Sequence, residues 1–287
     1  MHAKSEWEIF MDEVLGVKNR ITYGVTLVPL GVCYLYCLSS YIKAFRRNLA
    51  VHEISPLLPL VIYGHNHLKI TCPTTIVFVV VFMGLLKLIN DDPIEVALVC
   101  LLFLYLFAVI YQVLIALISI HRFFNNRRLI ELRKELTIAD VNKLYWCVNI
   151  IVTTKEVGTA FVMNGIFEFG VWHLNMLHIY FFEGYIFYQI LLFIATALQF
   201  SMKSVPATSL SENNIVNHTK ILGLTKFVLF IITGISYVTG IQTIVALSMF
   251  CSIDLSLVPV VIEITEIRAT TNVIQQSNNV NAPGESV

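Results

Sequence analysis

The amino-acid sequence predicts an all-α protein, a bundle of seven membrane-spanning helices with its N-terminus outside the cell and its C-terminus inside. Three observations predict this fold class. Of the 287 residues, 57% are apolar and only 13% are charged, whereas a soluble domain usually carries about a quarter charged residues. The apolar residues form long blocks, and the lysines and arginines gather in alternate connections between those blocks.

The length of the apolar blocks indicates that they cross a bilayer. Residues 96–118 run for 23 positions without a charge, and Gln112 is their one strongly polar side chain. About 18 apolar residues in succession suffice to predict a spanning helix. Lipid offers the backbone no hydrogen-bond partners, so each span is expected to be a helix. We expect seven spans, over residues 21–42, 70–89, 94–120, 144–166, 179–202, 221–240 and 241–264.

The two ends of the chain are expected to lie outside the bundle, which covers residues 21–265. Residues 1–20 are expected to form an extracellular tail, since their seven charged side chains make them too polar for a cleaved signal peptide. Residues 266–287 are expected to form a cytoplasmic tail, whose polar composition predicts disorder.

The sequence also predicts the structure of three segments that connect the spans. Residues 49–63 are apolar but too short to span, and Pro56 and Pro59 interrupt them, so we expect an interfacial loop. Residues 125–136 are expected to form a short basic helix on the inner face. The last two spans form one apolar stretch, and Gly240 is the expected position of the turn between them.

The orientation follows from the distribution of lysine and arginine, which favour cytoplasmic loops. With the N-terminus outside, thirteen basic residues fall on the inner side and only three on the outer side. Six or eight spans would break this alternation, so the bias also supports the number of spans. The inner residues are Lys43, Arg46, Arg47, Lys69, Arg122, Arg127, Arg128, Arg133, Lys134, Lys143, Lys203, Lys220 and Arg268.

Several classes of function find no support. The net charge is zero, so nothing indicates a nucleic-acid partner. The six cysteines show no zinc or disulfide spacing, and His65 and His67, in an expected cytoplasmic loop, do not fit H-E-x-x-H. We therefore expect no enzyme, no metal and no cofactor. The sequence also lacks an internal repeat, which weighs against transporters built from duplicated halves.

Three stretches carry a resemblance to known receptors. They are "HEISPLLPLVIYGHNHLK" after the first span, "LISIHRFF" at the end of the third and "CSIDLSLVPVVIEITEIR" in the last. The chain resembles the G-protein-coupled receptors, and over roughly residues 20–268 it looks most like the nematode serpentine chemoreceptors of class Z (Srz). It departs from the rhodopsin-like receptors, whose last helix carries Asn-Pro-x-x-Tyr, because residues 258–262 read Val-Pro-Val-Val-Ile.

The resemblance implies a chemosensory receptor that binds a small molecule and activates a heterotrimeric G protein. It also implies a multi-pass position in the plasma membrane of sensory neurons, including their cilia, with the lipid bilayer as a partner. His121, Arg122 and Phe123 then form the switch for G-protein coupling and activation, because a planar guanidinium suits such switching. The alternative is that Arg122 anchors its helix in the headgroup layer and that His121 is an interfacial histidine.

Four charged side chains inside the expected spans form a second candidate site. A charge there costs about 2.5–3.5 kcal/mol on insertion scales and marks a functional site by default. Lys155 and Glu156 lie about 100° apart around a helix axis, so each is expected to need a separate partner. Asp254 is a candidate partner for Lys155 or Lys226. We interpret the group as a charge lock or ligand pocket, with a structural ion pair between helices as the alternative.

Further polar residues extend this candidate pocket. Glu183 and Gln189 lie in the fifth span and Gln112 in the third, near several tyrosines. They would line a small-molecule pocket between helices, or belong to an aromatic belt and ordinary packing. The alternative for the whole protein is a multi-pass transporter or channel that uses the intramembrane charges as an ion path.

Overall fold

The computed structural model describes residues 17–74, 77, 94–127, 136–167, 172–202, 210–238 and 253–271 of the chain. Every regular element within these residues is helical, which confirms the all-α class. The elements are α2 (Val17–Glu53), α3 (Leu58–Asn66), the π-helix η1 (His67–Thr71), α5 (Ile94–Arg127), α6 (Ile138–Phe167), α7 (Trp172–Ser201) and α8 (Leu210–Val238). A helix over residues 253–271 follows, here called the C-terminal helix.

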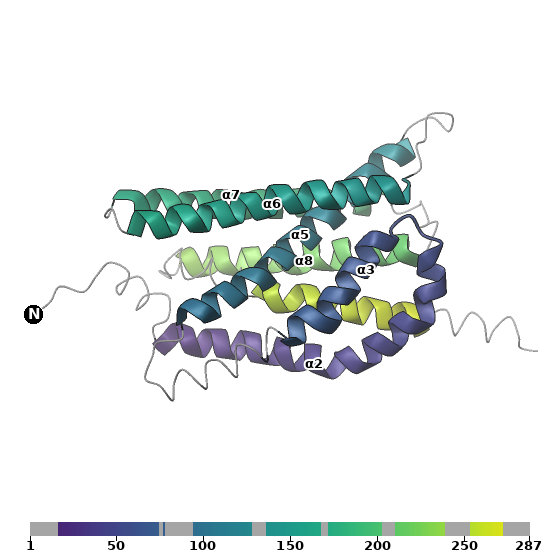
Figure 1. The fold of residues 1–287 in the computed structure, drawn as a ribbon, viewed down its shortest axis with the longest axis horizontal. Helices are drawn as coiled ribbons and strands as arrows, with labels where there is room; N and C mark the ends of the chain where they lie inside the picture. The colour runs from purple at the N-terminus through teal and green to yellow at the C-terminus, as the bar shows by residue number, and fades with distance from the viewer. Residues whose placement is uncertain are drawn as a thin grey trace, which may run out of the picture.

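The long helices run side by side, and α5 crosses the bundle obliquely (Figure 1). α5 packs against α6, α7 and α8, and α7 also packs against α6 and α8. The ends of α2, α5 and α7 and the starts of α3, α6 and α8 gather at one end of the bundle (Figure 1). We call this the inner end, because the sequence predicts that these connections face the cytoplasm.

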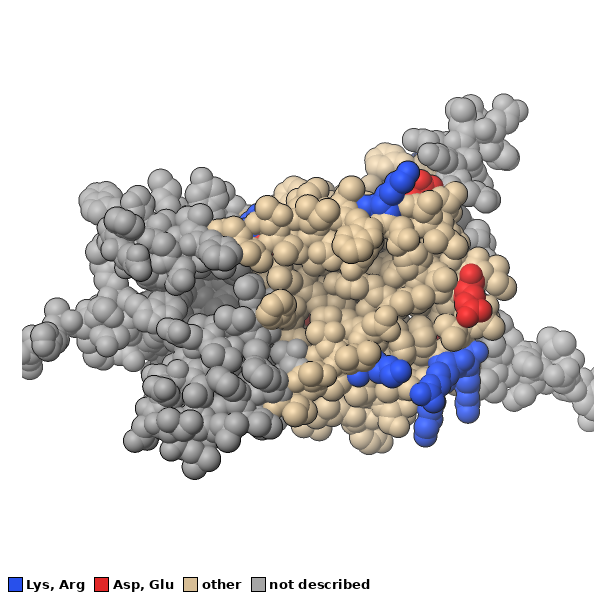
Figure 2. Space-filling view, in the orientation of Figure 1, with Lys and Arg blue, Asp and Glu red and all other residues tan. Residues whose placement is uncertain are grey.

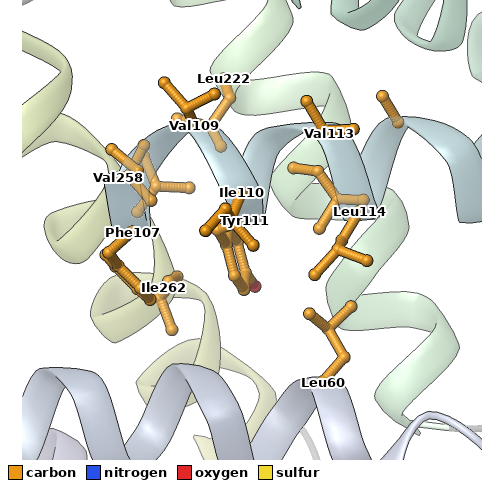
Figure 3. Close-up of a cluster of buried hydrophobic side chains, with 14 of the residues drawn as sticks. Leu60, Phe107, Val109, Ile110, Tyr111, Val113, Leu114, Leu222, Val258 and Ile262 are labelled. Atoms are coloured by element: carbon orange, nitrogen blue, oxygen red, sulfur yellow. The ribbon is translucent and has the colours of Figure 1, made fainter. Parts of the chain in front are cut away.

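α5 forms the centre of the packed core. Its residues 105–116 are all buried, and a helix that is buried all round occupies the middle of a bundle. Figure 3 shows α5 side chains lying against Leu60 of α3, Leu222 of α8 and Val258 of the C-terminal helix. α5 therefore lies at the centre of the bundle and carries Gln112 and, at the inner end, Arg122.

The start of α6 is set by its own sequence. The Asp140 amide donates to Thr137 Oγ1 at 3.2 Å, and Asp140 Oδ2 accepts from the Thr137 amide at 3.2 Å. This reciprocal capping box satisfies two amides that the start of a helix leaves unpaired. α6 therefore begins before residue 144, where the expected span begins.

The stretch 49–63 is helical at both ends, so the expected interfacial loop is wrong. α2 continues into this stretch and α3 begins within it. Pro59 lies in the first turn of α3, where the missing amide proton costs nothing, and Pro56 stands in the turn between the helices. The Leu57 amide donates to Ser55 Oγ at 3.2 Å and closes the corner. Pro59 thus stands at the start of a helix and Pro56 in the turn before it, so neither interrupts a helix.

His65 and His67 belong to this helical segment and not to a cytoplasmic loop. The His65 ring stacks on Phe45 of α2 with 3.7 Å between centroids, and the His67 ring stacks on Phe107 of α5 at 3.6 Å. The π-helical turn η1 includes His67, and helix continues to residue 74. The sequence does not predict this stacking, because partners this far apart in the chain leave no local pattern.

Two helices of the described part are long and apolar enough to cross a membrane, over Phe103–Arg127 and Gly184–Ser201. They fall within or close to the expected third and fifth spans. The full count of seven spans and the orientation of the termini stay predictions.

The helix boundaries differ from the expected spans at the C-terminal side. α8 begins at Leu210, well before residue 221, and the C-terminal helix runs to residue 271, into the stretch that was expected to be a disordered tail. The expected turn at Gly240, the basic segment 128–135 and most of the second span lie outside the described residues.

Candidate functional site

Several charged and polar side chains lie buried inside the bundle, and several large apolar side chains lie on its surface. Tyr36, Ile151 and Phe187 are 85%, 67% and 61% exposed, whereas Lys226 and Asp254 are 0% and 1% exposed. On the face drawn in Figure 2, uncharged surface covers the middle and most visible lysines and arginines lie toward the inner end. A soluble protein rarely buries such charges. The buried polar groups are therefore the candidate sites.

Lys226 of α8 is the centre of the first group, here called the middle cluster. Its Nζ donates to Asp254 Oδ2 of the C-terminal helix at 2.7 Å, to Gln189 Oε1 of α7 at 2.9 Å and to Gln112 Oε1 of α5. The Tyr185 hydroxyl donates to the same Asp254 oxygen at 2.9 Å. Of the two partners that the sequence offers for Asp254, the structure pairs it with Lys226. Four helices thus converge on one ammonium group.

The middle cluster retains unused hydrogen-bonding capacity. Within the described residues, Gln112 Nε2, Gln189 Nε2 and Asp254 Oδ1 are buried and have no hydrogen-bond partner. A buried polar atom left unpaired costs about 1–3 kcal/mol, so such atoms call for a water molecule or a ligand. The cluster therefore offers amide donors and a carboxylate acceptor to a small polar molecule.

Lys155 and Glu156 of α6 bind each other, so the expectation of separate partners is wrong. Lys155 Nζ lies 2.8 Å from Glu156 Oε1, and the Tyr188 hydroxyl donates to the same oxygen at 3.3 Å. The two Cβ atoms diverge around the helix, but the long lysine side chain lets the ammonium return to its neighbour. Gly184 of α7 provides the space, because a Cβ there would collide with the Lys155 side chain. Glu183 lies in α7 beside it, with its side chain outside the described part.

Arg122 stands at the inner end of α5 and reaches two other helices. Its Nε donates to Glu212 Oε1 of α8, and its Nη1 donates to Gln199 Oε1 of α7 at 2.9 Å. Gln199 Nε2 in turn donates to the Ser119 carbonyl oxygen of α5 at 2.8 Å. The side chains of Arg122 and Glu212 are only 10% and 17% exposed. This geometry favours a contact between helices over a headgroup anchor.

His121 and Phe123, which flank Arg122 in the sequence, have different surroundings. Phe123 lies under the guanidinium of Arg127, 5.1 Å from the ring centroid to Cζ, and His121 is half-buried. The partners that join Arg122 to other helices, Glu212 and Gln199, are the ones that sequence reasoning missed. Glu212 lies between the expected fifth and sixth spans, where an acidic side chain does not stand out.

A second buried group lies at the inner end between α2, α8 and the C-terminal helix, and we call it the inner cluster. Glu266 Oε1 accepts from Asn48 Nδ2 at 2.7 Å and lies 2.9 Å from His52 Nε2. Glu266 Oε2 accepts from Asn214 Nδ2 at 2.8 Å. Ser211 Oγ lies 2.7 Å from His52 Nδ1. One carboxylate therefore joins three helices.

The inner cluster was not predicted, although the sequence contains one signal for it. Asp254, Val258, Ile262 and Glu266 follow one another at intervals of four, so successive members lie on adjoining parts of the helix surface, with an acid at each end of an apolar stretch. The expected end of the last span at residue 264 placed Glu266 in the tail and hid this pattern.

The protonation states of the inner cluster follow from burial and hydrogen bonding. Burial by itself raises the pKa of Glu266, but the hydrogen bond and charge of His52 and the hydrogen bond from Asn48 outweigh it, so the pKa falls below its ordinary value. Burial lowers the pKa of His218 to about 4. At pH 7, Glu266 is therefore charged, and the His218 ring, 2.7 Å from the Tyr111 hydroxyl, is neutral.

A small cavity borders the inner cluster. Its volume is about 20 Å³ and its lining includes Asn214, His218 and Glu266. Asn214 Oδ1 and His218 Nε2 are buried without a hydrogen-bond partner in the described part of the chain. The cavity accommodates about one water molecule and is far too small for an ordinary ligand.

Comparisons of the chain with models of protein families, with curated proteins and with solved structures found no match. Among the described residues, no three His, Cys, Asp or Glu side chains are placed to hold a metal ion. Function therefore has to be inferred from the geometry of the two clusters and of Arg122.

Proposed function

We propose that the chain is a membrane receptor that binds a small molecule and activates a heterotrimeric G protein. The observation that carries this proposal is the pairing of Arg122 with Glu212 and Gln199 at the inner end. These contacts tie together α5, α7 and α8, whose separation there would open a cavity for a G protein. The resemblance to the serpentine chemoreceptors also implies a role in G-protein coupling for Arg122, at the inner end of the third span.

The outward-facing apolar side chains support a position in a lipid bilayer, which we propose is the plasma membrane. A large contiguous apolar surface marks contact with a membrane or a partner, and intramembrane charges face the interior of a bundle. The exposed apolar residues of α5 to α8 include Phe103, Trp146, Ile150, Ile151, Ile186, Phe187, Ile190, Ile194, Leu224, Phe227, Val228, Phe230 and Ile231.

In this proposal the arrangement seen here is the inactive one. Separation of the inner ends of α5 and α8 takes Glu212 away from Arg122. The guanidinium then meets backbone carbonyl oxygens of the G protein, for which its planar set of donors is suited. A ligand drives this change only through different affinities for the two arrangements, and each tenfold difference supplies about 1.4 kcal/mol.

The middle cluster is where the ligand would act. A small polar molecule that accepts hydrogen bonds from Gln112 and Gln189, or donates to Asp254, would compete for the contacts that Lys226 now makes. Those contacts belong to α5, α7, α8 and the C-terminal helix, three of which are also joined at Arg122. The same helices would therefore carry the ligand's effect to the inner end.

The buried pair of Lys226 and Asp254 favours a second candidate, a transporter or channel whose ion path uses these charges. Ion flux into lipid vesicles that contain the purified protein, without any G protein, would support this candidate. Nucleotide exchange on an added G protein, without flux, would support the receptor.

The proposal is tested through basal activity, because the ligand is not identified. Glu212→Gln releases Arg122, so we expect several-fold higher basal nucleotide exchange on purified G proteins. Arg122→Ala is expected to reduce exchange at least tenfold at unchanged surface expression. Arg127→Gln, which removes a nearby charge that stacks on Phe123, is the matched control. Basal exchange equal to wild type in both test variants would sink the role of Arg122.

The expected orientation has its own test. Asn217 lies in the one N-glycosylation sequon of the chain, Asn217-His218-Thr219, which the proposal places inside the cell, where it stays unmodified. We expect no glycan on Asn217, and a C-terminal tag that antibody reaches only after permeabilisation. A glycan, or a tag exposed on intact cells, would place Arg122 on the wrong side for a G protein.

A further inference from the structure

Glu263 and Glu266 lie about one turn apart on the C-terminal helix, yet their surroundings are opposite. Glu266 is held by hydrogen bonds from Asn48 and Asn214 and by His52. Glu263 is 0% exposed, and neither of its carboxyl oxygens has a hydrogen-bond partner among the described residues. Two carboxyl groups in such different environments take different protonation states.

The groups that act on Glu263 electrostatically come from two other segments. They are Tyr34, Cys37 and Tyr41 of α2 and Cys72 of the helix that follows η1. Phenols and thiols are neutral at pH 7, so none of these neighbours supplies a positive charge. The Tyr34 hydroxyl also donates to the Leu68 carbonyl oxygen at 2.8 Å, which commits its proton elsewhere.

Among the described residues, an ionised carboxylate at this position would be buried, unpaired and without hydrogen bonds. Such a group costs so much free energy that it takes up a proton instead of remaining charged. We propose that Glu263 is a proton-binding site, at which the bundle in this arrangement holds a neutral carboxylic acid. The site is separate from Arg122 and from both clusters, and it requires neither a ligand nor a G protein.

A proton fits this site better than a metal cation does. Hard cations such as Na⁺, Mg²⁺ and Ca²⁺ take several oxygen ligands. The described groups that act on Glu263 are two phenols, both already hydrogen-bonded to other partners, and two thiols. A proton needs only the carboxylate itself.

The bound proton links pH to the arrangement of the helices. Any arrangement that lets water reach Glu263, between α2 and the C-terminal helix, releases the proton. Acid therefore stabilises the arrangement seen here, and alkaline pH favours one in which Glu263 is hydrated and charged, because linkage is reciprocal. If this arrangement is the inactive one, then acid lowers basal activity, a consequence that does rest on the proposed function.

The first experiment is chemical labelling of the full chain in lipid nanodiscs at pH 7 with dicyclohexylcarbodiimide. This reagent reacts with protonated carboxyl groups: the acid adds across one C=N bond, its proton goes to nitrogen, and the acyl group then migrates to nitrogen without a leaving group. We expect one adduct, assigned to Glu263 by fragment masses. The adduct is absent in Glu263→Gln, present in Glu266→Gln, and weaker as the pH is raised.

Protection from the label by Na⁺, but not by choline at equal ionic strength, would identify a metal-cation site and overturn the proposal. If the reagent does not reach the site, infrared spectroscopy decides instead. The carbonyl stretch of a protonated carboxyl group is expected in the wild type at pH 7, lost in Glu263→Gln and kept in Glu266→Gln. Identical spectra for the wild type and Glu263→Gln would overturn the proposal.

Discussion

The middle cluster and the inner cluster each gather several helices around one buried charge, but they use their partners differently. In the inner cluster both oxygens of Glu266 are engaged, by groups from α2 and α8. In the middle cluster Asp254 Oδ1 is unpaired, as are the amide nitrogens of Gln112 and Gln189, among the described residues. The carboxylate of Glu266 is therefore fully engaged, whereas the carboxylate of Asp254 keeps one oxygen for a further partner.

This difference bears on where a small polar molecule would bind more favourably. A ligand gains binding energy where buried groups are unpaired, and it loses energy where it has to displace satisfied hydrogen bonds. The middle cluster offers the first situation. At the inner cluster both oxygens of Glu266 already have partners, and Asn214 Oδ1 and His218 Nε2, unpaired in the described part of the chain, border a space for about one water molecule. The cavity beside the inner cluster, about 20 Å³, also excludes anything larger than water.

The largest loss of stability is expected for Glu266→Ala in the inner cluster. Glu266→Ala removes the carboxylate that His52, Asn48 and Asn214 share, and among the described residues only Asn48 keeps another acceptor for the same nitrogen, Thr270 Oγ1 at 2.8 Å. Each buried donor left unpaired costs about 1–3 kcal/mol. We expect a large drop in the midpoint of thermal unfolding of the purified protein in micelles. Arg268→Gln, an exposed charge two residues away, is the control and is expected to change little. A midpoint unchanged by Glu266→Ala would remove the structural role of the inner cluster.

A double substitution tests whether Lys226 and Asp254 of the middle cluster stabilise the bundle as a pair. Lys226→Met alone leaves Asp254 without its counter-ion, with an expected cost of about 3 kcal/mol. Adding Asp254→Leu is expected to restore most of the stability, because apolar pairs often replace a buried ion pair without loss. The unfolding midpoints of the two single variants and the double variant measure the coupling. Additive losses would show that the two residues do not act as a pair.

A smaller loss of stability is expected for Gly223→Ala in α8, at a position between the two clusters. A Cβ there would meet the branched side chain of Thr196 on α7, and such overpacking costs about 1–3 kcal/mol. Gly158→Ala is the matched control, since nothing lies within 4 Å of a Cβ at that position. It is expected to stabilise α6 by about 0.5–1 kcal/mol. Equal unfolding midpoints for the two variants would contradict the close approach of α7 and α8.

Gly223→Ala is also expected to affect the two clusters differently. The middle cluster includes Gln189 of α7, whereas the described partners of Glu266 come from α2 and α8. Pushing α7 away from α8 therefore disturbs the contact between Lys226 and Gln189 but leaves the hydrogen bonds of Glu266 in place. Hydrogen exchange of the amides around each cluster reports which of the two has loosened.

Much of the candidate site was predictable because buried charges in apolar helices are rare. Lys226, Asp254, Gln112 and Gln189 stand out in the sequence for this reason, and the structure brings all four together. Glu266 did not stand out, because a carboxylate near the end of an apolar block reads as the start of a polar tail. Glu212, the partner of Arg122, did not stand out either, because it lies between two expected spans.

The sequence by itself determined that the chain is helical and that its helices carry apolar surfaces, because hydrogen bonds within a helix and apolar periodicity are local properties. Only the tertiary structure decided which buried groups are satisfied. Lys226 meets Asp254 across 28 positions and Asn48 meets Glu266 across 218. Such contacts depend on side-chain reach and helix packing, as the return of Lys155 to Glu156 over Gly184 illustrates. That is also why Glu263 and Glu266, alike in sequence and one turn apart, differ in their partners.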